Sequence, residues 1–230
     1  MDLVRASHLY KVFGKNERQV IERLKAGESR EELASLGTAA VIDVSFEVAK
    51  GETFVVMGLS GSGKSTLIRM INGLWSPSEG TVEVAGKVVS GMNDAQMRAL
   101  RRDHVSMVFQ HFALLPHLTV RENAAYGLKL QGKLKQKERL EKANEWLNTV
   151  GLNGWGDKYP HQLSGGMQQR VGLARALAAE TDILLMDEAF SALDPLIRRE
   201  MQDQLLELQG ALNKTIIFIT HDLNEAMYLG

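Results

Sequence analysis

The stretch GLSGSGKST at residues 58–66 limits what this chain can fold into more than any other part of its sequence. It follows the apolar run TFVVM and has the spacing of a phosphate-binding loop that joins a strand to a helix. Gly58, Gly61 and Gly63 allow the backbone to curl with its N–H groups turned inward, where they bind anionic oxygens. A glycine-rich turn that binds nothing is the alternative, but the strand–loop–helix context favours a nucleoside triphosphate site.

The side chains of this loop carry the chemistry that such a site needs. Lys64 can reach the β- and γ-phosphates, and the hydroxyl of Ser65 can bind Mg²⁺. The helix that begins here adds a partial positive charge at its N-terminus. The candidate nucleotide-binding residues of the loop are Gly58, Leu59, Ser60, Gly61, Ser62, Gly63, Lys64, Ser65 and Thr66.

Composition narrows the class of protein. The 230 residues are enough for one large domain, or for a domain with a subdomain. Lys and Arg total 27 against 28 Asp and Glu, so no strong field attracts the chain to nucleic acid or anionic lipid. Cysteine is absent, which excludes a disulfide framework. No apolar run approaches the length that spans a bilayer, so any membrane role must come through a partner.

Strand patterns alternate with helical patterns along the chain. Strands are expected at residues 3–13, 41–48, 53–57, 105–109, 183–186 and 214–220, and a β-hairpin at 81–84 and 87–89. Helices are expected at residues 66–72, 93–102, 119–130, 134–150 and 196–208, and from the LSGGM segment to residue 179. This alternation predicts an α/β fold with a mostly parallel sheet, into which residues 119–163 insert a helical segment.

An insertion with helical spacing separates the first two expected strands. Its first helix should end near Gly27, and a capping box of Ser29 and Glu32 should begin a second helix that Gly37 closes. We therefore expect a helical hairpin between two strands. A surface insertion without any chemistry is an equally good interpretation.

Polar residues follow directly after the expected strands. They are Lys64, Gln110, Asp187, Glu188 and His221. In a parallel sheet the carboxyl ends of the strands meet at one edge, and ligands bind there. The sequence therefore predicts that these side chains act together.

Taken together, the motifs resemble those of the ATPase subunit of ATP-binding cassette (ABC) transporters over nearly the whole chain. The matching motifs, in family order, are Walker A at 58–66, the Q-loop residue Gln110, the signature LSGGM at 163–167, Walker B ILLMDE at 183–188, the D-loop SALD at 191–194 and the switch histidine His221. Met167 stands where the signature usually has glutamine, and we expect a modest effect because the Ser-Gly-Gly core is intact.

The resemblance implies a role for each catalytic candidate. Asp187 would hold Mg²⁺ with Ser65, and Gln110 would complete the metal's ligands. Glu188 would act as general base or orient the attacking water; a second acid near the metal is its alternative role. His221 would contact the γ-phosphate, whereas a histidine that merely faces solvent is the alternative.

The resemblance also implies how ATP is enclosed. Phe13 would stack on adenine, where the family more often has tyrosine. Ser164, Gly165 and Gly166 begin a helix, and in the family this turn covers the γ-phosphate bound to a second copy of the subunit. Asp194 in the D-loop would line the interface between the two copies.

Three segments resemble the glycine betaine/proline betaine importer subclass: the insertion at 15–40, MVFQHFALLPHLTV and MDEAFSALDPLIRREMQDQL. The implied protein is an ATPase at the cytoplasmic face of a bacterial plasma membrane, which drives a permease fed by a substrate-binding protein. Residues 112–119 would dock the permease. Import of another solute is one alternative. A DNA-repair, chromosome or translation ATPase is another, which the near-neutral charge disfavours because such proteins bind nucleic acid.

The resemblance implies one ABC ATPase domain over residues 1–230, with a P-loop NTPase core. Its expected parts are the helical hairpin at 15–40, a RecA-like core with an antiparallel β subdomain at 41–110, a helical subdomain at 111–165 and further RecA-like core at 166–230. Family members continue beyond the position of Gly230, and many of this subclass add regulatory CBS modules. We therefore expect the chain to be a piece of a longer protein.

Overall fold

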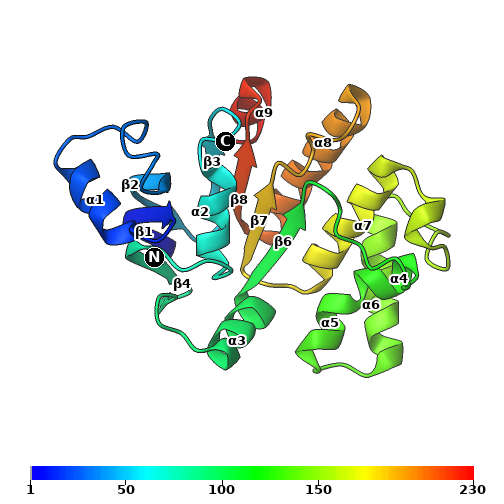
Figure 1. Cartoon of the computed structure of the whole chain (residues 1–230). Coiled ribbons are helices and arrows are strands. Elements are labelled where there is room, and N and C mark those ends of the chain that lie inside the picture. Colours follow the sequence, from blue (N-terminus) through cyan, green and yellow to red (C-terminus); the bar gives the residue numbers. More distant parts are fainter. Residues whose placement is uncertain (1) are drawn as a thin grey trace. The chain divides into compact units, whose positions relative to one another are not determined.

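The computed structural model describes residues 2–230, and within them the chain divides into two compact units (Figure 1). The first unit comprises residues 2–50 and Met57–Met97, and the second comprises Gly51–Val56 and Arg98–Gly230. Among the helices of residues 2–230, none combines the length and the apolar composition that crossing a bilayer requires.

An antiparallel sheet in the order β2-β1-β4-β5 forms the first unit. Its strands are β1 (Asp2–Phe13), β2 (Thr38–Ala49), β4 (Glu79–Val84) and β5 (Lys87–Val88). Alternate residues of β1 such as Val4 and Val12 are fully buried, as expected for a strand with one face on a core. The predicted strands and hairpin are confirmed.

The insertion differs in part from its prediction. The helix α1 (Glu17–Lys25) ends where expected, because Gly27 takes the left-handed conformation at φ +97°. The capping box also forms, with Ser29 N–H donating to Glu32 Oε2 at 2.8 Å. The second helix was predicted wrongly, because residues 30–36 form turns. Leu33 of this segment is buried in the small core under α1.

The sheet of the second unit has the order β3-β8-β7-β6. Its strands are β3 (Thr53–Met57), β6 (Val105–Phe109), β7 (Ile183–Asp187) and β8 (Thr215–Thr220). The neighbours β6, β7 and β8 pair in parallel. Every residue of β7 is buried, as expected for a strand covered on both faces. The predicted α/β class, with one parallel and one antiparallel sheet, is confirmed.

The helices of the second unit follow the predicted order with changed bounds. They are α4 (Val120–Ala124), α5 (Tyr126–Gln131), α6 (Gln136–Thr149), the 3₁₀ turn Pro160–Gln162, α7 (Gly165–Ala178), α8 (Pro195–Leu212) and α9 (Leu223–Leu229). The helix expected at 119–130 divides at Ala125, just before Gly127, whose added Cβ would lie 3.1 Å from the methyl of Ala179. Sequence reasoning did not predict α9.

Two further helices complete the chain. The helix α2 (Lys64–Ile71) begins at Lys64, two residues before the predicted start, because the left-handed Gly63 caps it. The helix α3 (Asp94–His104) begins after Asn93, whose Oδ1 accepts a hydrogen bond from Gln96 N–H at 2.9 Å. The helix predicted at residues 93–102 is therefore confirmed, with Asn93 as its cap.

Candidate functional site

The phosphate loop in the first unit has a backbone that requires glycine. Gly61 and Gly63 have positive φ values of +77° and +92°, which side chains strongly disfavour. A Cβ on Gly63 would lie 1.9 Å from the carbonyl oxygen of Ala40, and one on Gly58 would lie 2.9 Å from Ser62 Oγ. The loop therefore exposes backbone without side chains and lies against β2, and such a backbone allows the close approach of phosphate oxygens.

The Lys64 side chain is folded back onto this loop. Its ammonium donates to the carbonyl oxygens of Gly58 at 2.7 Å and Leu59 at 2.8 Å. The helix α2 begins at the same residue, and the N–H groups at the N-terminus of a helix favour an anion. Positive charge and N–H donors are therefore combined at the loop. The remaining predicted loop residues with exposed side chains or backbone are Leu59, Ser60, Gly61 and Ser62.

Phe13 ends β1 as half of an aromatic pair. Its ring forms a T-shaped pair with the ring of Trp75, with centroids 5.0 Å apart and planes at 77°. Lys11 Nζ lies 5.2 Å from the Phe13 centroid, and the Arg69 guanidinium lies 4.9 Å from that of Trp75. Phe13 is still 38% exposed, which leaves π surface for a base. Sequence reasoning identified Phe13 but missed Trp75.

In the second unit, the parallel sheet brings polar strand-end residues to one level. Phe109, Asp187 and Ile219 are register partners on β6, β7 and β8, so Gln110 and Glu188 follow neighbouring strands at the same edge. Asp187 is buried at the end of β7. The structure therefore brings the predicted residues of this unit to one edge of the sheet, and their joint action stays a prediction.

Glu188 and His221 are in direct contact. Glu188 leaves β7 with a left-handed φ of +47°, and its N–H donates to the Ile219 carbonyl at 3.0 Å. This turn directs the carboxylate to His221, whose Nδ1 lies 3.2 Å from Glu188 Oε2. A proton on Nδ1 would donate to the carboxylate and give Nε2 an acceptor lone pair. The Glu188 side chain is 17% exposed and that of His221 is 51% exposed, so the pair is open to solvent on the histidine side.

The loop after Gln110 is held by an arginine that sequence reasoning missed. Phe112 and Ala113 are both left-handed, at φ +57° and +48°. Arg175 on α7 donates to the carbonyl of Phe112 at 3.2 Å and to that of Ala113 at 2.7 Å. Burial lowers the pKa of the Arg175 guanidinium from its ordinary value, and its two carbonyl partners offset part of that desolvation cost. The loop is therefore tied to the helix that the signature begins.

The signature segment forms the N-terminus of α7. Ser164 is the N-cap, and its Oγ accepts a hydrogen bond from Met167 N–H at 3.3 Å. Ser164 and Gly165 are exposed, whereas a Cβ on Gly166 would lie 2.8 Å from Ile197 on α8. The Met167 side chain packs against the core of the unit instead of joining the exposed turn.

Asp194 in the D-loop has a structural role as the N-cap of α8. Its Oδ1 accepts a hydrogen bond from the N–H of Ile197 at 3.1 Å. Proline at the next position, Pro195, suits the first turn of a helix. The D-loop therefore leads directly into α8.

The predicted magnesium ligands are of mixed type. Among residues 2–230, His, Asp and Glu side chains form no group of three or more that could hold a metal ion. The proposed donors are instead the Ser65 hydroxyl, the Gln110 amide and the Asp187 carboxylate, oxygen ligands of the kind that Mg²⁺ prefers. Gln110 follows β6 and Asp187 ends the neighbouring strand β7 in the second unit, whereas Ser65 belongs to the first. Their joint action stays a prediction.

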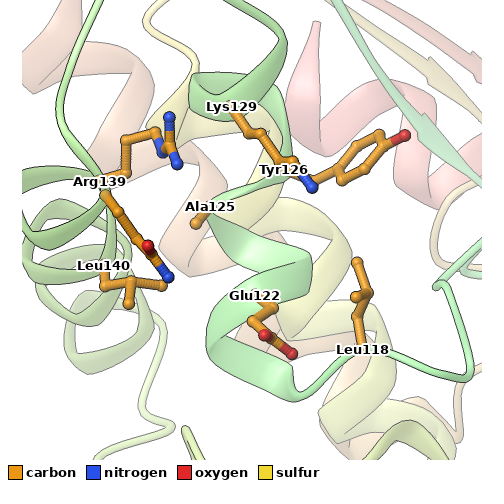
Figure 2. Close-up of a pocket in the computed structure, with 8 residues that line it drawn as sticks. Leu118, Glu122, Ala125, Tyr126, Lys129, Arg139 and Leu140 are labelled. Atoms are coloured by element: carbon orange, nitrogen blue, oxygen red, sulfur yellow. The ribbon is translucent and has the colours of Figure 1, made fainter. Parts of the chain in front are cut away.

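A hollow of about 220 Å³ lies between α5 and α6 (Figure 2). Figure 2 shows Arg139 and Leu140 of α6 on one side of it and Glu122, Ala125 and Tyr126 on the other. Its lining residues are Leu118, Glu122, Ala125, Tyr126, Lys129, Gln136, Arg139 and Leu140. Apolar and charged side chains thus share a concave surface beside the loop that was predicted to dock a partner.

Comparison with known proteins places these features in a family. The sequence model described as "ABC transporter" matches residues 41–191. The glycine betaine transport ATP-binding protein OpuAA of Bacillus subtilis is 55% identical over 99% of this chain and 54% of its own length. The glycine betaine/carnitine transport ATP-binding protein GbuA of Listeria monocytogenes is 53% identical over 100% of this chain and 58% of its own length. The chain therefore spans about half the length of these curated relatives.

A solved structure gives the same result for the fold. It is the dimeric post-hydrolysis state of the ATP-binding cassette MJ0796 bound to ADP and Pi. Its TM-score is 0.83 at 32% sequence identity, and the match covers 98% of this chain and 90% of that one.

Proposed function

Because this chain belongs to the ABC transporter family, we propose that it hydrolyses ATP to drive import of a quaternary-amine osmolyte through a membrane permease. The contact between Glu188 and His221 is the observation that carries the hydrolytic part. The names of these two relatives support glycine betaine as the solute, and the carnitine in one name keeps a different solute open. Proline betaine is included because of the subclass that the sequence resembles. The chain would act at the cytoplasmic face of a bacterial plasma membrane, with a substrate-binding protein as indirect partner and no nucleic acid.

The phosphate loop and Phe13 would bind ATP. The exposed surface of the Phe13 ring would stack on adenine, and Lys64 would turn its ammonium from backbone carbonyls to phosphate oxygens. Ser65, Gln110 and Asp187 would supply oxygen ligands to Mg²⁺, which when bound neutralises phosphate charge.

Glu188 and His221 would act on the water that attacks the γ-phosphate. The Glu188 carboxylate would accept a proton as the water oxygen bonds to phosphorus, and the bond from phosphorus to the β–γ bridging oxygen would break to release ADP. With Nδ1 directed at Glu188, His221 would hold its ring in one orientation beside the γ-phosphate. Positioning and charge stabilisation, not covalent chemistry, would supply the rate enhancement.

Two copies of the chain would enclose each nucleotide. The N-terminus of α7 has Ser164 and Gly165 exposed and Gly166 partly buried, and the N-terminus of a helix favours an anion. We infer that it covers the γ-phosphate bound to the second copy. A related cassette was solved as a dimer with ADP and Pi, which supports this arrangement.

The test measures ATP turnover of the 230-residue chain against its concentration. Turnover should rise more steeply than linearly, because two chains form each site. Glu188→Gln should keep ATP binding, lose most turnover and accumulate an ATP-bound dimer in light scattering. A strictly linear rate would contradict the shared site, and near-normal hydrolysis by Glu188→Gln would remove that residue from its proposed role.

The permease would dock at the hollow between α5 and α6 and at the loop before it. Leu118, Ala125 and Leu140 supply apolar area, and Glu122 and Arg139 supply charge for a helical segment of the partner. Leu118→Glu should abolish transport and co-purification of the permease while basal ATPase activity persists. Leu130→Glu is the matched control, since Leu130 is exposed on α5 and does not line the hollow. Equal loss of transport in both variants would place the docking surface elsewhere.

A further inference from the structure

One face of α8 contacts Asp222, which follows His221, and reaches Thr220, which precedes it, through Glu225. Arg198 and Gln202 are separated by one helical turn, so their side chains leave α8 in the same direction. Arg198 contacts Asp222, the residue after His221, and Gln202 contacts Glu225 near Thr220, the residue before it. The helix that begins at the D-loop therefore holds the histidine segment from both sides.

Arg198 also holds the D-loop itself. Its Nη2 donates to the carbonyl oxygens of Ser191 at 3.3 Å and Leu193 at 3.2 Å, while its Nη1 donates to Asp222 Oδ2 at 3.4 Å. A guanidinium is planar and its donors are fixed relative to one another. A shift of the D-loop carbonyls therefore changes how well the same group can bind Asp222.

Asp222 transfers such a shift to the backbone beside His221. Its Oδ1 caps α9 by accepting from the N–H groups of Asn224 at 2.8 Å and Glu225 at 3.3 Å. The carboxylate is thus shared between the start of α9 and Arg198. Because His221 is the preceding residue, movement of this carboxylate moves the imidazole relative to Glu188.

The opposite flank of His221 is anchored. Thr220 Oγ donates to Glu225 Oε2, and Gln202 Nε2 donates to Glu225 Oε1 at 3.0 Å. All three side chains belong to buried residues, and breaking a buried polar cluster of this kind is costly. Thr220 therefore acts as a fixed point. Its Oγ1 also accepts a hydrogen bond from the Asp222 N–H at 2.9 Å, so the group beside His221 that Arg198 can adjust is the Asp222 carboxylate.

We propose that Arg198 is a positioning residue that transmits the state of the D-loop to the switch histidine. The inference rests on the proposed function, in which the D-loop lines the interface with a second copy of the chain. Closure of that interface sets the Ser191 and Leu193 carbonyls, the guanidinium follows them, and Asp222 then places His221 against Glu188. Hydrolysis is in this way confined to the closed dimer.

The first experiment compares Arg198→Met and Arg198→Lys with Arg199→Met in the 230-residue chain. Both Arg198 variants should lower kcat about tenfold while the Kd for mant-ATP stays unchanged. Methionine removes the charge and the donors, and lysine keeps the charge but lacks the forked donors of the guanidinium. Arg199 is the matched control. It stacks on Tyr228 at 3.5 Å and pairs with Asp203 at 3.4 Å, so its loss loosens α8 from α9 without touching the D-loop.

The second experiment is a double-mutant cycle with Asp222→Asn, which keeps an equally good helix cap but removes the charge. If Arg198 acts through Asp222, the double variant loses no more kcat than the worse single variant. The proposal would be overturned if the kcat losses of the two single variants multiply in the double variant. It would also be overturned if Arg198→Met lowers kcat no more than Arg199→Met does. Absence of ATPase activity in the unmodified chain would instead overturn the proposed function on which it rests.

Discussion

Asn123 should contribute more to the free energy of unfolding than a typical polar side chain, because its hydrogen bonds are buried and several in number. The residue is fully buried at the fourth position of α4. Its Oδ1 accepts from Leu115 N–H at 2.8 Å, and its Nδ2 lies 3.0 to 3.1 Å from the carbonyl oxygens of Leu115, Leu118 and Thr119. One side chain thus supplies the hydrogen bonds of a whole turn of the proposed docking loop.

The magnitude follows from counting hydrogens. The amide offers two N–H hydrogens and accepts one, so Asn123→Ala removes about three hydrogen bonds at about 1 kcal/mol each. The Thr119 carbonyl keeps its helical bond from the Asn123 N–H at 2.8 Å, which limits the penalty for unpaired groups. The free energy of unfolding should therefore fall by about 3 kcal/mol, and Tm by about 6 to 12 °C for a chain of this size.

Urea titration would measure the change in free energy, and hydrogen exchange at the Leu115 amide would show where it acts. Asn148→Ala is the control, because Asn148 is exposed on α6 and should cost less than about 0.5 kcal/mol. A loss below about 1 kcal/mol for Asn123→Ala, or unchanged exchange at Leu115, would refute the hydrogen-bond accounting.

The nucleotide loop and the aromatic pair give two further expectations. Gly63→Ala should abolish mant-ATP binding, because its Cβ would meet the Ala40 carbonyl at 1.9 Å, whereas Gly61→Ala has open space around it and should cost only its backbone strain. If Gly63→Ala and Gly61→Ala bind mant-ATP equally well, the close approach of Gly63 to Ala40 on β2 is not needed for binding. Phe13→Leu should raise the Kd for ATP about tenfold while Phe13→Tyr leaves it nearly unchanged, as stacking requires. ATP should also change the emission of Trp75, whose ring forms a T-shaped pair with that of Phe13; a response that survives in Trp75→Phe would refute this.

Much of the fold was predictable because its signals are local. The strands β3 and β6 have the bounds predicted from their apolar runs, and the Ser29–Glu32 capping box formed as expected. Two predictions failed for different reasons. The helix expected after Ser29 does not form, and its buried residue Leu33 packs into the core with residues distant in sequence. The helix α9 has a local signal that sequence reasoning did not use, since Asp222 caps it by accepting from the N–H groups of Asn224 and Glu225. The contact of Glu225 with Gln202, a residue 23 positions earlier, has no local pattern.

The residues of the candidate site also differ in whether the sequence alone could identify them. Glu188 and His221 could be named from the sequence because their side chains carry the chemistry, and the structure brings them into contact. Arg175, Arg198 and Asn123 could not, because each binds main-chain carbonyls, which every residue type supplies. It follows that the partners of these side chains can change residue type freely while the side chains themselves cannot. A search for positioning residues in such a chain should therefore begin with buried donors that face backbone carbonyls beside a motif.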